Sequence, residues 1–157
     1  MNELYPVIMQ NLQQAIQTNN NDFAISLLND LNEIAGFSHH FFSSILKQVS
    51  ENLMTLCTSN IDNELKQSAM EIFLVLIENY TSQFKKSGFL PNILVVLLNW
   101  LASICDDDID DWINEETEET LFEYAEDSLE LLTNLVGGKP LRETLFAKCG
   151  EYLVKNE

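Results

Sequence analysis

The stretch "NELKQSAMEIFLVL", residues 63–76, places apolar side chains three or four positions apart, which is typical of a helix with one buried stripe. Two other stretches superpose on it, "DFAISLLNDLNEIA" at 22–35 and "TLFEYAEDSLELLT" at 120–133. The equivalent apolar positions are Ala24, Leu65 and Phe122, then Leu31, Ile72 and Leu129, then Ile34, Val75 and Leu132. The first interval is 41 residues and the second is 57, and a two-helix unit of about 40 residues is the length of a HEAT or armadillo repeat. The sequence therefore predicts a repeated helix pair.

The same three-to-four spacing extends over most of the chain, and strand-like alternation is absent from the sequence. Five glycines and three prolines in 157 residues leave little turn-forming material for an all-β fold. Cap residues and permissive glycines mark the breaks between helices. We predict seven helices, at about 3–18, 22–35, 39–57, 62–80, 89–105, 119–136 and 140–155.

The predicted fold class is all-α, a HEAT/armadillo-type α-solenoid of antiparallel helix pairs with about seven helices. We predict that residues 1–157 form one continuous HEAT-repeat segment, with repeats at about 1–36, 37–80 and 88–137 and the first helix of a further repeat at 139–157. The longer second interval corresponds to an acidic insertion at 106–119. The last helix lacks a partner for its apolar residues, so we expect the chain to be a piece of a longer solenoid.

The formal net charge is −17, with only eight Lys and Arg residues, so the sequence argues against a nucleic-acid partner. Three widely spaced cysteines favour neither a disulfide framework nor a zinc site. The longest apolar runs, 72–77 and 93–98, are too short for membrane insertion. Thirteen of the 25 acidic residues lie between Ser87 and Gly138, where Lys and Arg are absent, which favours a basic protein partner.

Nine carboxylates in the acidic insertion invite several interpretations. Asp106, Asp108 and Asp110 match the start of a calcium loop, but Asp111 stands where that loop needs Gly and Thr117 where it needs Glu. Catalysis by paired carboxylates would require an apolar pocket and a base, and the sequence offers neither nearby. We therefore expect no metal, no cofactor, no catalytic residue and no enzyme activity.

Two interpretations of the insertion remain open. Charged runs are usually solvated loops without a ligand, yet a plain spacer has little reason to carry Trp112 at its centre. That ring either folds back onto the helices or contacts a ligand cation. The candidate partner-binding residues are Asp106, Asp107, Asp108, Asp110, Asp111, Trp112, Glu115 and Glu116.

Several stretches resemble importin-beta-type nuclear transport receptors, and most closely the importin-beta-3 branch. They are "ELKQSAMEIFLVLIENYTSQFKK" at 64–86, "FLPNILVVLLNWLASICDDDIDDWINEE" at 89–116 and "AEDSLELLTNLVGGK" at 125–139. The agreeing residues are Gln67, Ala69, Glu71, Asp110 to Trp112, and Gly137 to Lys139.

The resemblance implies a HEAT-repeat karyopherin that shuttles between cytoplasm and nucleus and acts by binding. It implies three kinds of partner: basic cargo proteins with localisation signals, the Ran GTPase and Phe-Gly nucleoporins. The net charge also permits a different class, a free-standing acidic scaffold or histone-chaperone-like protein that binds basic partners.

Overall fold

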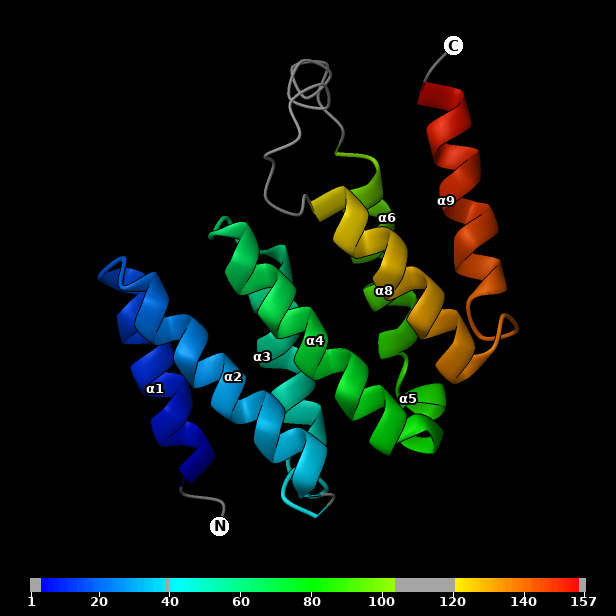
Figure 1. Cartoon of the computed structure of the whole chain (residues 1–157). Helices are drawn as coiled ribbons and strands as arrows, with labels where there is room; N and C mark the ends of the chain where they lie inside the picture. The colour runs from blue at the N-terminus through cyan, green and yellow to red at the C-terminus, as the bar shows by residue number, and fades with distance from the viewer. Residues whose placement is uncertain (1–3, 39, 104–120, 156–157) are drawn as a thin grey trace. The chain divides into compact units, whose positions relative to one another are not determined.

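The computed structural model describes residues 4–38, 40–103 and 121–155, and every regular element within these ranges is a helix (Figure 1). The backbone divides into two compact units, Met1–Tyr80 and Thr81–Glu157. The helices of unit 1 are α1 (Leu4–Gln17), α2 (Asn21–Phe37), α3 (Leu46–Thr58) and α4 (Asn63–Asn79). Those of unit 2 are α5 (Thr81–Ser87), α6 (Phe89–Leu101), α8 (Leu121–Val136) and α9 (Arg142–Lys155).

Consecutive long helices run antiparallel in each unit, as α1 with α2, α3 with α4, and α6 with α8 (Figure 1). The all-α, HEAT-like class of antiparallel helix pairs is confirmed, with eight helices in the described ranges where about seven were expected. The division into repeats stays a prediction. None of the described helices combines the length and apolar character that a membrane crossing needs.

Helix α4 is the centre of unit 1, where it packs against both α2 and α3. Helix α4 includes residues 63–76, whose apolar spacing indicated the repeated helix pair, and most of its apolar side chains are buried. The contacts on two sides explain why the sequence there is apolar over more than one narrow stripe. The buried residues of α4 are Leu65, Ser68, Ala69, Met70, Ile72, Phe73, Leu74, Leu76 and Ile77.

Local chemistry fixes several helix ends as the sequence indicated. Asp62 caps α4, since its carboxylate accepts a hydrogen bond from the Glu64 N–H at 2.9 Å. Gly88 separates α5 from α6 and Gly137 ends α8, with φ angles of 76° and 75°. Residues with a Cβ rarely adopt these left-handed angles, so glycine is the natural choice at both breaks.

The predicted start of the third helix at residue 39 is wrong, because α3 begins at Leu46. Residues 40–45 form turns in which the Ser43 hydroxyl donates to the His40 carbonyl at 2.8 Å. Phe42 is buried there, with its ring edge-on to Phe41 at a centroid distance of 4.8 Å. A serine hydroxyl that bonds nearby backbone competes with helix formation, while Phe42 anchors the turn to the core.

Helix α5 was not predicted, although its seven residues form a separate helix between α4 and α6. Phe84 is its one buried residue, and the helix contacts α6 and α8. A single apolar position gives no periodic signal, so the sequence pattern does not reveal a helix of this length.

Candidate functional site

The predicted partner-binding segment, 106–119, lies outside the described residues, so the docking role assigned to its carboxylates and Trp112 stays a prediction. The same holds for the calcium-loop match at its start. The structure does describe the two helices that the segment connects, because α6 ends at Leu101 and α8 begins at Leu121. The last helix described before the segment and the first described after it therefore both belong to unit 2.

The end of α6 and the start of α8 contact each other through two aromatic side chains. Trp100 is buried in the last turn of α6, and its ring lies 6.3 Å from that of Tyr124 in the first turns of α8, with 51° between the ring planes. The Ala102 N–H donates to the carbonyls of Leu98 and Trp100, which closes the end of α6. The end of α6 and the start of α8 are therefore packed against each other.

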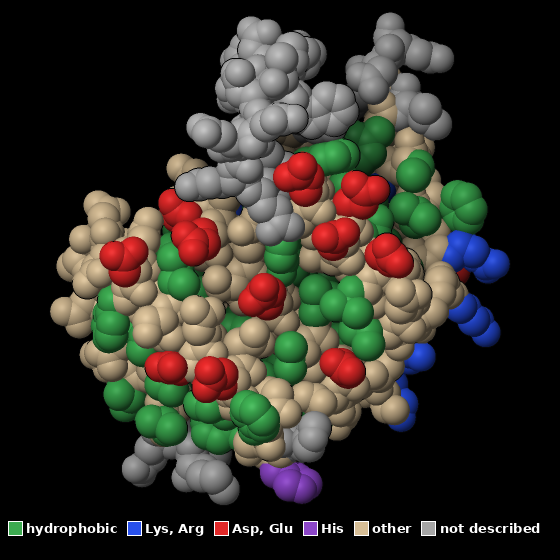
Figure 2. Space-filling model, viewed as in Figure 1, with side chains coloured by type: hydrophobic (Ala, Val, Ile, Leu, Met, Phe, Trp, Pro, Cys, Tyr) green, Lys and Arg blue, Asp and Glu red, His purple; other side chains and the backbone are tan. Residues whose placement is uncertain are grey.

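Carboxylates are also exposed on the described helices. Figure 2 shows exposed acidic side chains, and the described helices of each unit carry them, α2 and α4 in unit 1 and α8 in unit 2. On α8 they occur on successive turns, and on α2 and α4 they share the surface with exposed polar side chains. The exposed acids are Asp22, Asp30 and Glu33 on α2, Glu64, Glu71 and Glu78 on α4, and Glu123, Glu126, Asp127 and Glu130 on α8. Because these side chains are exposed, a single ion pair with any one of them contributes little to stability or binding. Their main effect is on the negative electrostatic potential that the charges produce together.

Within the described ranges, no three His, Cys, Asp or Glu side chains lie close enough together to hold a metal ion. The Cys57 thiol is buried against α4, with its sulfur 3.9 Å from the Lys66 carbonyl oxygen. Burial raises the pKa of this thiol from 9.0 to about 12, because the thiolate would lose its hydration. Cys57 therefore stays protonated at neutral pH and is a core residue, not a nucleophile.

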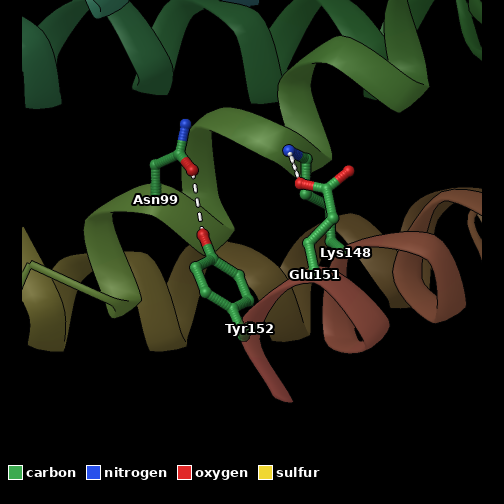
Figure 3. Close-up of polar contacts among 4 residues, drawn as sticks. All are labelled: Asn99, Lys148, Glu151 and Tyr152. Atoms are coloured by element: carbon green, nitrogen blue, oxygen red, sulfur yellow. Dashed lines mark hydrogen bonds and ion pairs between the residues drawn. The ribbon is translucent and has the colours of Figure 1, made fainter. Parts of the chain in front are cut away.

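Helix α9 packs against α6 through half-buried side chains (Figure 3). The Tyr152 hydroxyl donates to the Asn99 Oδ1 atom at 2.9 Å, which links the two helices. Lys148 forms an ion pair with Glu151 at 2.6 Å along α9 itself. Phe146 remains 69% exposed and Val154 75% exposed, so α9 presents an apolar surface that the described residues leave uncovered.

The sequence analysis missed two features of unit 2. It did not pair Asn99 with Tyr152, since two polar residues 53 positions apart give no local signal. It also did not single out the cations Lys85, Lys86, Lys139 and Arg142. A signal for these was present in the sequence, because Asp and Glu are absent between Glu78 and Asp106 and between Glu130 and Glu143.

No family model matches the chain. The chain is similar to a protein from Dictyostelium discoideum described as a probable importin-5 homolog, with 25% identity over 116 residues. The matched residues are 73% of this chain and 11% of that protein. The similarity is to a segment of a much longer protein that is named as an importin and not as an enzyme. Together with the helix pairs, it supports a karyopherin-like segment at this coarse level.

Proposed function

We propose that this chain is a segment of a nuclear import receptor that binds its partners through protein-protein contacts and carries out no chemical reaction. The observation that carries the proposal is the similarity to the probable importin-5 homolog over 73% of the chain. The HEAT-like helix pairs agree with it, because stacked pairs offer extended surfaces for binding. The importin-beta-3 branch is the closest assignment that the sequence motifs favour.

The repeats at about 1–36, 37–80 and 88–137 would then belong to one longer array, with α9 as the first helix of the next pair. The uncovered apolar residues of α9 support this assignment, since each paired helix in the units buries such residues against its neighbour. The whole receptor would shuttle between cytoplasm and nucleus, release cargo on binding the Ran GTPase and contact Phe-Gly nucleoporins.

Within this receptor, we assign the segment 106–119 to the docking of Lys- and Arg-rich parts of cargo or of Ran. Its carboxylates would attract basic partners, and Trp112 would give a short-range contact to one cation. A cation–π contact adds about 0.5–2 kcal/mol, and an exposed ion pair adds about 0.2–1 kcal/mol. No single pair suffices, so recognition must use several carboxylates at once.

Titration of a labelled basic localisation-signal peptide tests this assignment. Neutralising five aspartates should weaken binding, reduce its dependence on salt and slow association more than it speeds dissociation, because exposed charges act at long range and are screened over about 8 Å at physiological salt. The five substitutions are Asp106→Asn, Asp107→Asn, Asp108→Asn, Asp110→Asn and Asp111→Asn. An unchanged affinity and salt slope would leave the segment as a solvated spacer.

A control variant removes five negative charges from exposed positions of unit 1. It distinguishes a local effect of segment 106–119 on peptide binding from the effect of the lower net charge of the whole chain. Its five substitutions are Asp22→Asn, Asp30→Asn, Glu33→Gln, Glu51→Gln and Glu64→Gln. We expect a smaller loss of affinity from this control than from the aspartate variant. Trp112→Ala should differ from both by raising the dissociation rate, since a ring contact forms only after the partner has docked.

The second candidate function is a free-standing acidic scaffold or histone-chaperone-like protein, which the net charge of −17 favours. Such a protein would bind basic partners without any response to the Ran nucleotide state. Pull-down of Ran loaded with a non-hydrolysable GTP analogue or with GDP, using the longest natural chain that contains these helices, distinguishes the two. Capture of the GTP form alone supports the receptor, whereas capture of neither form supports the scaffold.

A further inference from the structure

Four of the six Lys and Arg residues of unit 2 lie at one end of the α6–α8 helix pair. Lys85 and Lys86 lie in the last turn of α5, and Lys139 and Arg142 flank the turn between α8 and α9. Helix α5 contacts both α6 and the antiparallel α8, and it directly precedes the start of α6. Figure 1 accordingly shows α5 beside the end of α8 from which the turn to α9 begins.

In Figure 2, the Lys and Arg side chains that are clearly visible lie toward the right edge of the view. All four cations are exposed. We call Lys85, Lys86, Lys139 and Arg142 the basic edge.

The basic edge has no carboxylate partner among the described residues. The ion pairs that the structure shows are Lys47 with Glu51 in unit 1 and Lys148 with Glu151 on α9. Neither ion pair involves the basic edge. The sequence around Lys85 and Lys86, residues 79–105, contains no Asp or Glu, and neither does the sequence around Lys139 and Arg142 from residue 131 to residue 142. Four exposed cations in a chain with only eight are thus left without a described counter-charge.

The chemistry of the ligand follows from the local and the overall charge together. A long polyanion such as RNA would extend past the four cations and meet the field of a molecule with net charge −17. A short acidic segment would contact only the basic edge, because carboxylates farther away than about 8 Å are largely screened at physiological salt. Charge complementarity therefore favours a short peptide over a nucleic acid.

We propose that the basic edge is a docking surface for a short Asp- or Glu-rich segment of another protein. This goes beyond the proposed function, which concerns basic partners at a different part of the chain. The edge would give one molecule two surfaces of opposite preference, one for basic segments and one for acidic segments.

Binding of a fluorescein-labelled ten-residue peptide of alternating Glu and Ser, measured by anisotropy at about 150 mM salt, tests the proposal. We expect Lys85→Gln with Lys86→Gln, and separately Lys139→Gln with Arg142→Gln, each to weaken binding about threefold or more. All four together should weaken it about tenfold or more. The proposal requires that both double variants lose affinity for the peptide, since residues from two separate segments of the chain form the basic edge.

The matched control is Lys47→Gln with Lys66→Gln, which removes the same charge from unit 1. The basic edge is supported if this control keeps the affinity within about twofold of the unmodified chain. An equal loss in the control would reduce the effect to overall charge and overturn the proposal. Circular-dichroism melting curves of the basic-edge variants should coincide with that of the unmodified chain, because the four substituted side chains are exposed. In the control, Lys47 is exposed and Lys66 is half-buried, so its melting curve is measured as well.

Three other results would also overturn the proposal. They are the absence of measurable peptide binding at about 1 mM protein, tighter binding of an RNA oligonucleotide of equal charge, and self-association that disappears in the four-site variant. The aspartate variant of segment 106–119 should bind the acidic peptide at least as tightly as the unmodified chain. This arm separates failure of the basic edge from failure of the proposed docking of basic partners.

Discussion

At the residue scale, the described polar groups mostly hold the fold in place and are not poised for chemistry. Tyr5 of α1 accepts a hydrogen bond from the Asn52 amide of α3 at 2.9 Å, and Asn79 donates to the Ala35 carbonyl at 2.9 Å. Burial raises the pKa of Tyr5, in spite of the opposing effect of its bond to Asn52. Such bonds satisfy polar groups between the helices of unit 1 and link α1 with α3 and α2 with α4.

Cys57 provides a prediction at this scale. The pKa of its thiol is 9.0 when unfolded and about 12 when folded, so below pH 9 both states are protonated and the thiol causes no loss of stability. Between pH 9 and 12 only the unfolded state ionises, and the free energy of unfolding should fall by roughly 1 kcal/mol per pH unit. Urea unfolding at pH 7, 9 and 10.5 measures this slope.

The matched variant for that experiment is Cys57→Ala, which should be less stable at pH 7 but should fall less steeply above pH 9. Ionisation of Tyr and Lys side chains continues in the variant, so the difference between the two slopes isolates the thiol. Equal slopes would show that Cys57 is accessible to water in the folded protein.

At the element scale, the helices differ in how firmly they are held. Helix α4 buries side chains against two neighbours, whereas α9 contacts α6 mainly through half-buried residues and one hydrogen bond between side chains. Local opening costs least where few apolar contacts must be broken. We therefore expect amide hydrogens of α9 to exchange with solvent faster than those of α4.

The Tyr152 hydroxyl gives a sharper form of this prediction. Tyr152→Phe removes the bond to Asn99 and should cost about 0.5–1.5 kcal/mol locally, so α9 amides should exchange about two- to tenfold faster while α4 amides are unchanged. Hydrogen exchange followed by mass spectrometry resolves the two helices. Tyr5→Phe is the matched control and should act on unit 1 instead. No change in α9 would mean that the exposed bond contributes nothing.

At the scale of the whole molecule, the net charge of −17 opposes the folded state, because carboxylates lie closer together in a compact chain than in an unfolded one. Salt screens this repulsion. Raising NaCl from about 20 to about 200 mM should therefore raise the melting temperature, by a few degrees if the relief is about 1 kcal/mol. Thermal melts followed by circular dichroism measure the shift. A fall in melting temperature would mean that attractive ion pairs outweigh the repulsion.

The sequence indicated the helix pairs and several of their ends correctly, because both depend on neighbouring residues. A buried stripe repeats every three or four positions, and Asp62, Gly88 and Gly137 act on backbone within one turn of themselves. The turn at 40–45 and helix α5 were not predicted. Each contains a buried phenylalanine, Phe42 or Phe84, and its burial depends on tertiary packing and not on the neighbouring sequence. The role of segment 106–119 remains a prediction made from composition.

By itself, the sequence determined the fold class and the concentration of acid between Ser87 and Gly138. Only the tertiary structure showed which segments that carry Lys and Arg lie near each other. Helix α5, which carries Lys85 and Lys86, contacts α8, and Lys139 and Arg142 follow the end of α8, because α6 and α8 run antiparallel and bring that end back beside α5. Spacing along a chain predicts contacts within a helix, whereas contacts between residues some fifty positions apart depend on how helices pack.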